Sequence, residues 1–310
     1  ISCPEDGTET VVAIELGANN VVGSPPSLLY TLPNLQSLAL YSNPLDSMNF
    51  AGIHQATKLS ELYLDATGLT SLAGLEKAPP NLQRLNLRFN SLHGDFPTEL
   101  STLTSLEMLS MAYNDISGKL PTFLTNMTHL HSLLISHNHI KESLQNTQFP
   151  SSIRRLDVSH NHLSGTIGEN FLDLVPTNND DDIQLDIDLS SNDLTGTLPR
   201  SLVRFTHLDI YLADNALVAL HPHVCAMHDW NEGDVGRYGC NGLACPPGEY
   251  APNGRHTAST GPCRKCPTSS PYLGSSTCPD TSSATSLQRQ TSSWWLSSFG
   301  LLLMGAWMLQ

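Results

Sequence analysis

From Leu82 to Leu92 the sequence reads LQRLNLRFNSL, with apolar residues at its first, fourth, sixth and last positions and Asn90 at its ninth. In an extended strand Leu85 and Leu87 point to one face, and the residues between and beside them point to the other. The stretch therefore predicts a short strand with an apolar core face and an open face.

The same frame recurs along most of the chain. Its closing asparagine returns at steps of 24, 24, 23, 24, 24, 23, 31 and 23 residues if Thr67 fills one vacant slot. A fixed period of this length predicts coils that stack into a solenoid, because no single coil can bury its own apolar residues. The predicted ladder consists of Asn19, Asn43, Asn90, Asn114, Asn138, Asn161, Asn192 and Asn215.

Many coils continue after the strand as apolar, x, Gly, x, x, Pro, as in Leu92 to Gly94 to Pro97. With this half, the frame resembles the plant-type leucine-rich repeat family over roughly residues 10–220. The resemblance implies an α/β-type solenoid of about nine coils, with a parallel β-sheet on the concave face and a second short strand in many coils. Departures from the family pattern are Thr67 with Leu72, Ala73 and Gly74, the Ile140 coil without Gly and Pro, Gly168 in place of Pro, and Gln184 at an apolar slot.

A carboxamide with two donors and an acceptor can satisfy the backbone groups of the turn after each strand. Threonine can satisfy fewer of them, so we expect a weaker or remodelled rung at Thr67.

The chain divides into five segments. We expect the remnant of an N-terminal cap at 1–10, the solenoid at 11–220, a Cys-rich module at 221–280, a Ser/Thr-rich spacer at 281–293 and a hydrophobic tail at 294–310. In the plant-type family a Cys pair ends the N-terminal cap, which implies that Cys3 is the second member of such a pair; an unpaired thiol is the alternative.

Six cysteines lie after the last coil, in a segment rich in Pro, Gly, Ser and Thr. Their even number fits a disulfide-stapled module from an oxidising compartment, with 15 possible pairings. The alternative is zinc held by Cys240, Cys245, Cys263 and Cys266. The segment resembles the C-terminal caps of surface leucine-rich repeat proteins of unicellular algae, which implies pairing of Cys225 with Cys240. The disulfide candidates are Cys225, Cys240, Cys245, Cys263, Cys266 and Cys278.

The chain's end follows the order of a glycosylphosphatidylinositol signal: small residues at Ser282, a polar spacer, then an apolar tail. A short transmembrane helix is the alternative, since the tail is short for a span of ~20 residues. One sequon, at Asn126, predicts a glycan away from the strand face. These features predict the external face of the plasma membrane as the location, with a secreted protein as the alternative.

The open strand face is the candidate ligand-binding site, because aromatic and Arg residues favour interfaces. Four ring residues at one slot of successive coils form a continuous column, although scattered surface residues are the simpler interpretation. The candidates are Tyr63, Asp65, Arg84, Asn86, Arg88, Phe89, Tyr113, His137 and His160.

Two further groups of side chains are candidate metal sites. The first is a block of four histidines, which could bind a metal or protonate together, but no Cys or carboxylate completes a fixed ligand set. The second is an acidic group that could hold calcium, or could simply be a solvated surface. We predict no metal and no cofactor at either group: His137, His139, His160 and His162, or Asp186, Asp188, Asp209 and Asp214 with Asp180 to Asp182.

The chain carries a formal net charge of -14, which disfavours nucleic-acid binding. None of the motifs typical of nucleophilic hydrolases, metalloproteases or nucleotide-binding enzymes occurs in the sequence. We therefore expect a non-enzymatic recognition module at the cell surface that binds a protein, peptide or glycan, as a receptor, co-receptor or inhibitor. A membrane protein could be a further partner, and a structural coat or adhesion protein is the alternative.

Overall fold

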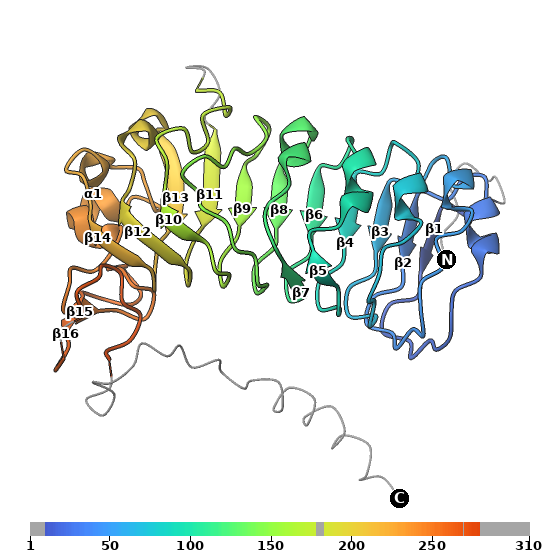
Figure 1. The fold of residues 1–310 in the computed structure, drawn as a ribbon, viewed down its shortest axis with the longest axis horizontal. Helices are drawn as coiled ribbons and strands as arrows, with labels where there is room; N and C mark the ends of the chain where they lie inside the picture. The colour runs from blue at the N-terminus through green and yellow to red at the C-terminus, as the bar shows by residue number, and fades with distance from the viewer. Residues whose placement is uncertain (1–9, 178–182, 269, 280–310) are drawn as a thin grey trace, which may run out of the picture. The chain divides into compact units, whose positions relative to one another are not determined.

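The computed structural model describes residues 10–177, 183–268 and 270–279. Nine parallel strands form one sheet in chain order, each paired with the strand of the neighbouring coil (Figure 1). The predicted nine-coil solenoid is confirmed. The strands of this sheet are β1 Ala13–Glu15, β2 Ser37–Ala39, β3 Glu61–Tyr63, β4 Arg84–Asn86, β6 Met108–Ser110, β8 Ser132–Leu134, β9 Arg155–Asp157, β11 Gln184–Asp188 and β13 His207–Tyr211.

The second half of several coils forms the additional short strands that the family resemblance implies. A two-stranded parallel pair and a three-stranded parallel sheet lie beside the main sheet, and an antiparallel pair lies in the Cys-rich module. These strands are β5 His93–Asp95 with β7 Asp115–Ser117, β10 Ser164–Thr166 with β12 Asp193–Thr197 and β14 Ala216–Ala219, and β15 Glu249–Tyr250 with β16 Arg264–Lys265.

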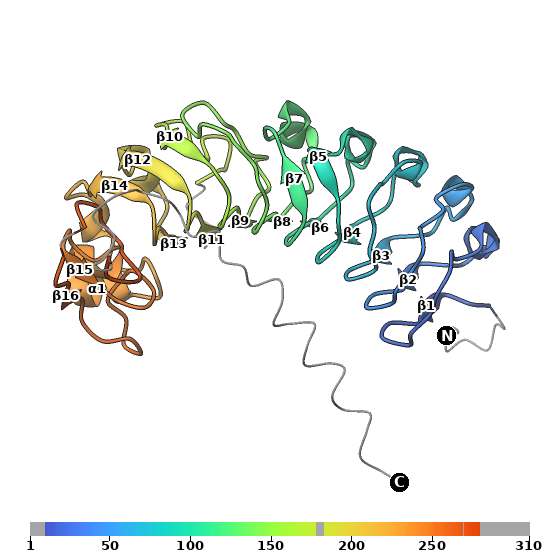
Figure 2. The same ribbon diagram turned by 60° about the horizontal axis from the view of Figure 1, so that its bottom comes forward.

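Short 3-10 helices complete the coils. Four of them begin directly after a proline, because proline fixes φ near the helical value and needs no hydrogen-bond acceptor there; these prolines are Pro26, Pro97, Pro121 and Pro199. In Figure 2 these helices lie on the outer side of the arc of coils, and the main sheet lies on the inner side. The helices are η1 Ser27–Thr31, η2 Ile53–Gln55, η3 Leu75–Lys77, η4 Thr98–Thr102, η5 Thr122–Asn126, η6 Arg200–Arg204, η7 Val224–Ala226, η8 Gly239–Gly242 and α1 Asp234–Tyr238.

The core is a single apolar cluster that runs through all coils, built from the frame leucines and from one aromatic residue in several coils. Leu85 and Leu87 are both fully buried, as the alternation of the strand requires. Asn126, the predicted glycosylation site, is exposed at the end of η5 on the outer side.

The asparagine ladder links each coil to the one before it. The Asn90 Oδ1 accepts from the backbone N–H of Leu69 at 2.9 Å, and its Nδ2 donates to the carbonyls of Leu64 and Leu87 at 2.8 and 3.0 Å. Seven of the eight ladder asparagines are buried; Asn19, in the first coil, is exposed.

The rung at Thr67 is remodelled. The Thr67 hydroxyl donates at 2.7 Å to the Leu64 carbonyl of its own coil, and no bond reaches back to Leu40 of the coil before. The Leu45 N–H, which an asparagine at position 67 would serve, instead donates to the Asn43 carbonyl at 2.9 Å. A hydroxyl group therefore satisfies its own turn but not the neighbouring one.

Three disulfides staple the C-terminal end: Cys225 with Cys240, Cys245 with Cys263, and Cys266 with Cys278. The implied pairing of Cys225 with Cys240 is confirmed. The zinc alternative is wrong, because all four cysteines that it requires are consumed in disulfides.

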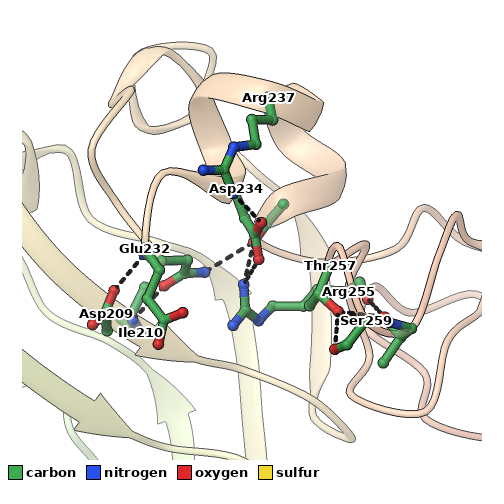
Figure 3. Close-up of polar contacts among 11 residues, drawn as sticks. Asp209, Ile210, Glu232, Asp234, Arg237, Arg255, Thr257 and Ser259 are labelled. Carbon is green, nitrogen blue, oxygen red and sulfur yellow. Dashed lines mark hydrogen bonds and ion pairs between the residues drawn. The ribbon is translucent and has the colours of Figure 1, made fainter.

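The C-terminal end also closes the edge of the main sheet. The Asn231 Oδ1 accepts from the N–H of Ile210 at 2.7 Å, and the Asp209 carboxylate accepts from the N–H of Glu232 at 2.9 Å (Figure 3). An open strand edge invites pairing with other chains, so these contacts protect β13.

Some predicted features lie outside the described residues. They are Cys3, Asp180 to Asp182, Ser282 and the segments 281–293 and 294–310. Within the described ranges, no helix combines the length and apolar character that a membrane span requires.

Candidate functional site

The nine candidate residues all lie on the open side of coils three to seven. Parallel pairing places Glu61 beside Arg84 and Tyr63 beside Asn86. Arg88 and Phe89 follow the strand, in the turn that leads to Asn90. The open face therefore presents strand residues on one side and turn residues on the other.

The four turn rings form a continuous stack across four coils. Phe89 and Tyr113 have centroids 4.4 Å apart, Tyr113 and His137 4.1 Å, and His137 and His160 4.0 Å, with interplanar angles of 22°, 14° and 11°. Stacked aromatic pairs contribute roughly 0.5–1.5 kcal/mol each beyond the area that they bury.

The stack depends on an unusual backbone conformation. All four ring residues have positive φ, between 50° and 58°, a region that bulky residues seldom adopt. Small residues precede three of the rings, namely Ala112, Ser136 and Ser159, and these are buried although their slot belongs to the open side. We infer that the rings lean over them.

The residue before the ladder asparagine, or before Thr67 in the third coil, has positive φ in all nine coils. Its N–H donates to the next coil, as from Tyr113 to the Ser136 carbonyl at 2.9 Å, so the shape of the turn repeats whatever the side chain. Ring residues occupy only the central coils. The residues of the slot are Ala18, Ser42, Ala66, Phe89, Tyr113, His137, His160, Ser191 and Asp214.

His137 lies inside the stack, and its imidazole stays neutral over a wide range of pH. Its pKa is lowered to about 4, chiefly by burial and then by the nearby imidazole of His160, whereas the carboxylate of Asp157 opposes this shift. Stacking with Tyr113 and His160 therefore occurs through an uncharged ring at neutral pH.

The polar candidates beside the stack are partly engaged with one another. Arg84 forms an ion pair with Glu61, a residue that the sequence did not single out. Asn86 donates through Nδ2 to the Asp65 carboxylate at 2.9 Å. Burial raises the pKa of Asp65, and the charge of Arg88 opposes this shift.

Arg88 lies against the rings. Its guanidinium carbon is 5.1 Å from the Phe89 centroid and 5.8 Å from the Tyr113 centroid. A guanidinium so placed gains cation–π attraction while its N–H groups remain donors.

The histidine block divides into two kinds. His139 and His162 stack loosely at 5.8 Å, and each faces a carboxylate, His139 with Asp115 at 3.6 Å and His162 with Asp193 at 3.9 Å. The sequence did not connect either carboxylate with the block.

Side chains of the acidic group form ion pairs and hydrogen bonds with other residues of the protein. Asp186 forms an ion pair with Arg155 at 3.2 Å, the Asp188 carboxylate accepts from Ser190, and Asp209 accepts from Gln184 Nε2 at 2.9 Å. Burial raises the pKa values of Asp186 and Asp188. In the part of the chain that the structure describes, no three His, Cys, Asp or Glu residues are grouped to hold a metal ion.

Several known proteins with leucine-rich repeats are similar to this chain. A family profile described as leucine rich repeat matches residues 57–116 and 80–140, and a second of the same description matches residues 152–174. Receptor-like protein 18 of Arabidopsis thaliana is 29% identical over 188 residues, which cover 53% of this chain and 22% of that protein.

Solved structures agree. The Arabidopsis receptor kinase HAESA, in complex with the peptide hormone IDA and the co-receptor SERK1, is 28% identical with a TM-score of 0.55, over 70% of this chain and 40% of that one. A leucine-rich repeat protein of Leptospira interrogans is 25% identical with a TM-score of 0.57, over 71% and 53%. The chain thus spans about a fifth of the curated relative and about half or less of these solved chains. The repeat frame, the nine-stranded parallel sheet and these matches together show that the chain carries leucine-rich repeats similar to those of plant receptor-like proteins and receptor ectodomains.

Proposed function

We propose that this chain is a non-enzymatic recognition module that binds a protein or peptide ligand through the ring stack and the polar residues beside it. The observation that carries the proposal is the stack itself. Four ring residues accept a strained conformation, and the outermost, Phe89, remains 51% exposed. Bulky rings occupy this left-handed slot only in the central coils, and exposed aromatic surface gathered at one place is typical of sites that a partner completes.

Two further observations support the proposal. The similar HAESA ectodomain was solved with a peptide hormone and a co-receptor, which makes a peptide or protein ligand the natural class here as well. Three disulfides fit a protein of the extracellular space, so we place the module at the cell surface or among secreted proteins. The membrane link through a lipid anchor or tail helix belongs to the same proposal.

The experiment is a selection of random linear peptides displayed on phage against the immobilised protein. Peptides that bind the stack should lose affinity for Tyr113→Ala and for Phe89→Ala. They should retain it for Glu99→Ala on η4, an outer-face control. Thermal unfolding of each variant confirms that the protein remains folded.

A structural coat or adhesion role is the alternative, in which the solenoid acts as a spacer with distributed contacts. In that case no selected peptide would distinguish Tyr113→Ala from Glu99→Ala. That result would overturn the proposed function.

A further inference from the structure

One end of the ring stack lies open. Among the described residues, Phe89 at that end contacts a single ring, that of Tyr113, with the centroids 4.4 Å apart and the planes inclined by 22°. The far face of the Phe89 ring is directed toward the third coil, whose strand β3 pairs with β4, and the residue as a whole is 51% exposed. Aromatic rings gain from stacking on either face, so this far face offers a contact that the protein itself does not use.

Arg88 does not cover the far face. Its guanidinium carbon lies 5.1 Å from the Phe89 centroid and 5.8 Å from the Tyr113 centroid. A group placed over the far face of Phe89 would be more distant from Tyr113 by nearly the whole spacing of the two rings. The guanidinium therefore lies beside the edges of both rings, and the far face of Phe89 stays open.

The third coil supplies the backbone for one more ring but not the ring. Ala66 occupies the slot of Phe89 one coil earlier, and the φ angles of the two residues are 54° and 53°. The N–H of Ala66 donates to the Arg88 carbonyl at 2.8 Å, as the N–H of Phe89 donates to the Ala112 carbonyl at 3.0 Å. The turn of the third coil thus has the shape of its neighbour, with a methyl group where the next ring of the stack would begin.

The two tyrosines nearest in sequence to this slot are engaged elsewhere. The ring of Tyr41, on the second coil, packs against Gly17 of the first coil so closely that Gly17 could carry no side chain. Tyr63, on β3, interacts with Arg84. Neither ring contacts Phe89 in the part of the chain that the structure describes. The space over the slot of the third coil is therefore left to a partner.

The opposite end of the stack is polar. His160 ends it there, and Ser191 follows in the slot of the eighth coil. The carboxylates of Asp157 and Asp188 interact electrostatically with the histidines of the stack. Covering an imidazole beside carboxylates removes water from polar groups, whereas covering a phenyl ring removes water from apolar surface only. An incoming aromatic ring therefore gains more at the Phe89 end.

We propose that an aromatic side chain of the ligand lies over Ala66 and stacks on the open face of Phe89, so that it continues the stack of the protein by one coil. Three observations meet at this place: a backbone slot that repeats at the spacing of stacked rings, an open ring face at its end, and a methyl group in the next position. This inference rests on the proposed function and names the ligand group that the stack receives.

Selected peptides test the ligand side of this contact. Peptides from the selection above are resynthesised with each aromatic residue replaced in turn by leucine, which keeps apolar bulk but has no ring face. We expect one replacement in each peptide to weaken binding about tenfold, the size expected for a lost ring contact together with the area that it buries.

Two pairs of variants assign the effect to one end of the stack. With Phe89→Leu the aromatic and leucine forms of a peptide should bind equally, whereas His160→Leu, at the other end, should preserve their difference. Ala66→Phe places a ring of the protein where the ligand ring is expected, and it should weaken binding of the aromatic form about tenfold. Ser191→Phe adds a ring in the same slot beyond His160 and should leave binding unchanged. Thermal unfolding of each variant confirms that the protein remains folded.

A small probe covers the case in which the selection yields no peptide. N-acetyltryptophanamide carries an aromatic ring and no charge. On titration its ring current should move the methyl NMR signal of Ala66 upfield, whereas the methyl signal of Ala18, in the same slot two coils earlier, should not follow. N-acetylleucinamide, which has no ring, should move neither signal.

The outcomes separate this inference from the proposed function. If the selected peptides need Tyr113 but tolerate leucine at every aromatic position and still bind Ala66→Phe, the stacking site is wrong and the proposed function stands. If no selected peptide needs Tyr113, the proposed function is wrong. Equal shifts of the Ala66 and Ala18 methyl signals, or no shift of either, would overturn the stacking site independently of the peptides.

Discussion

The central coils and the C-terminal end of this molecule are held together in different ways. In the central coils the ladder bonds and the ring contacts repeat with the period, so that each ring meets a ring one coil away. At the C-terminal end the contacts occur once each: a buried Asp234–Arg255 ion pair at 2.9 Å, the Trp230 Nε1 donating to the Phe205 carbonyl at 2.8 Å, and three disulfides.

Because of this difference, substitutions in the two regions should change stability and recognition separately. The rings are exposed or half-buried on the open face, so changes there should affect partners more than folding. The end segment buries Trp230 completely and covers the last strand, so changes there should affect folding first.

The largest effect should come from Arg255. Its side chain is buried against Asp234, and it also donates to the Gly242 carbonyl at 3.3 Å (Figure 3). Arg255→Ala leaves the Asp234 carboxylate buried without this partner, so we expect a loss of about 4 kcal/mol in the free energy of unfolding. Urea unfolding of the variant and of the unaltered protein measures this loss.

Arg237→Ala is the matched control. Arg237 also faces Asp234, at 3.6 Å, but its side chain is 61% exposed, and such pairs contribute about 0–1 kcal/mol. Equal losses for the two variants would contradict the view that burial at this end decides stability.

The second effect concerns the ladder of the central coils. Asn138 Oδ1 accepts from the Ile116 N–H at 3.0 Å, and its Nδ2 donates to the carbonyls of Met111 and Ile135. Asn138→Ala leaves three buried backbone groups without this partner, which should cost roughly 3 kcal/mol in unfolding free energy. The neighbouring, exposed His139→Ala should cost far less, and a similar loss would show that the ladder is not what joins the coils.

The third effect has the opposite sign. Thr67→Asn supplies the missing carboxamide, which can accept from the Leu45 N–H and donate to the Leu40 carbonyl as Asn90 does one coil later. We expect a gain of about 1 kcal/mol, measured by urea unfolding. A loss would mean that the remodelled rung has no room for the larger side chain.

Much of the central region could be predicted from the sequence, because a fixed period determines which residues become neighbours. Phe89 and Tyr113 fall in the same slot of consecutive coils, so their proximity followed from spacing alone. Their stacking did not, because it depends on the positive φ of that slot, which bulky residues do not signal.

The C-terminal end was far less predictable. Composition indicated disulfides, and the resemblance to algal caps implied one pair, but nothing in the spacing of Asp234 and Arg255 announced a buried ion pair. Contacts that occur once leave no repeated signal. For this reason the contacts of the solenoid can be predicted from the sequence, whereas those at its C-terminal end cannot.

The smallest effect is a dependence of stability on pH that originates in the stack. The pKa of His137 is about 4 in the folded protein against an ordinary value of 6.5, so between these values the unfolded chain binds the extra proton. The contribution of His137 to the free energy of unfolding is therefore fully present above pH 6.5, declines as the pH falls toward 4 and changes no further below pH 4. Because the ring is half-buried, we expect solvent to moderate the decline.

His137→Phe keeps a ring in the stack and removes the titration, so its unfolding free energy should depend less on pH across this window than that of the unaltered protein. Urea unfolding at pH 4.5 and 7, with His139→Phe as the control outside the stack, measures the difference; identical pH dependence in His137→Phe and the unaltered protein would show that His137 protonates in the folded stack as readily as in the open chain.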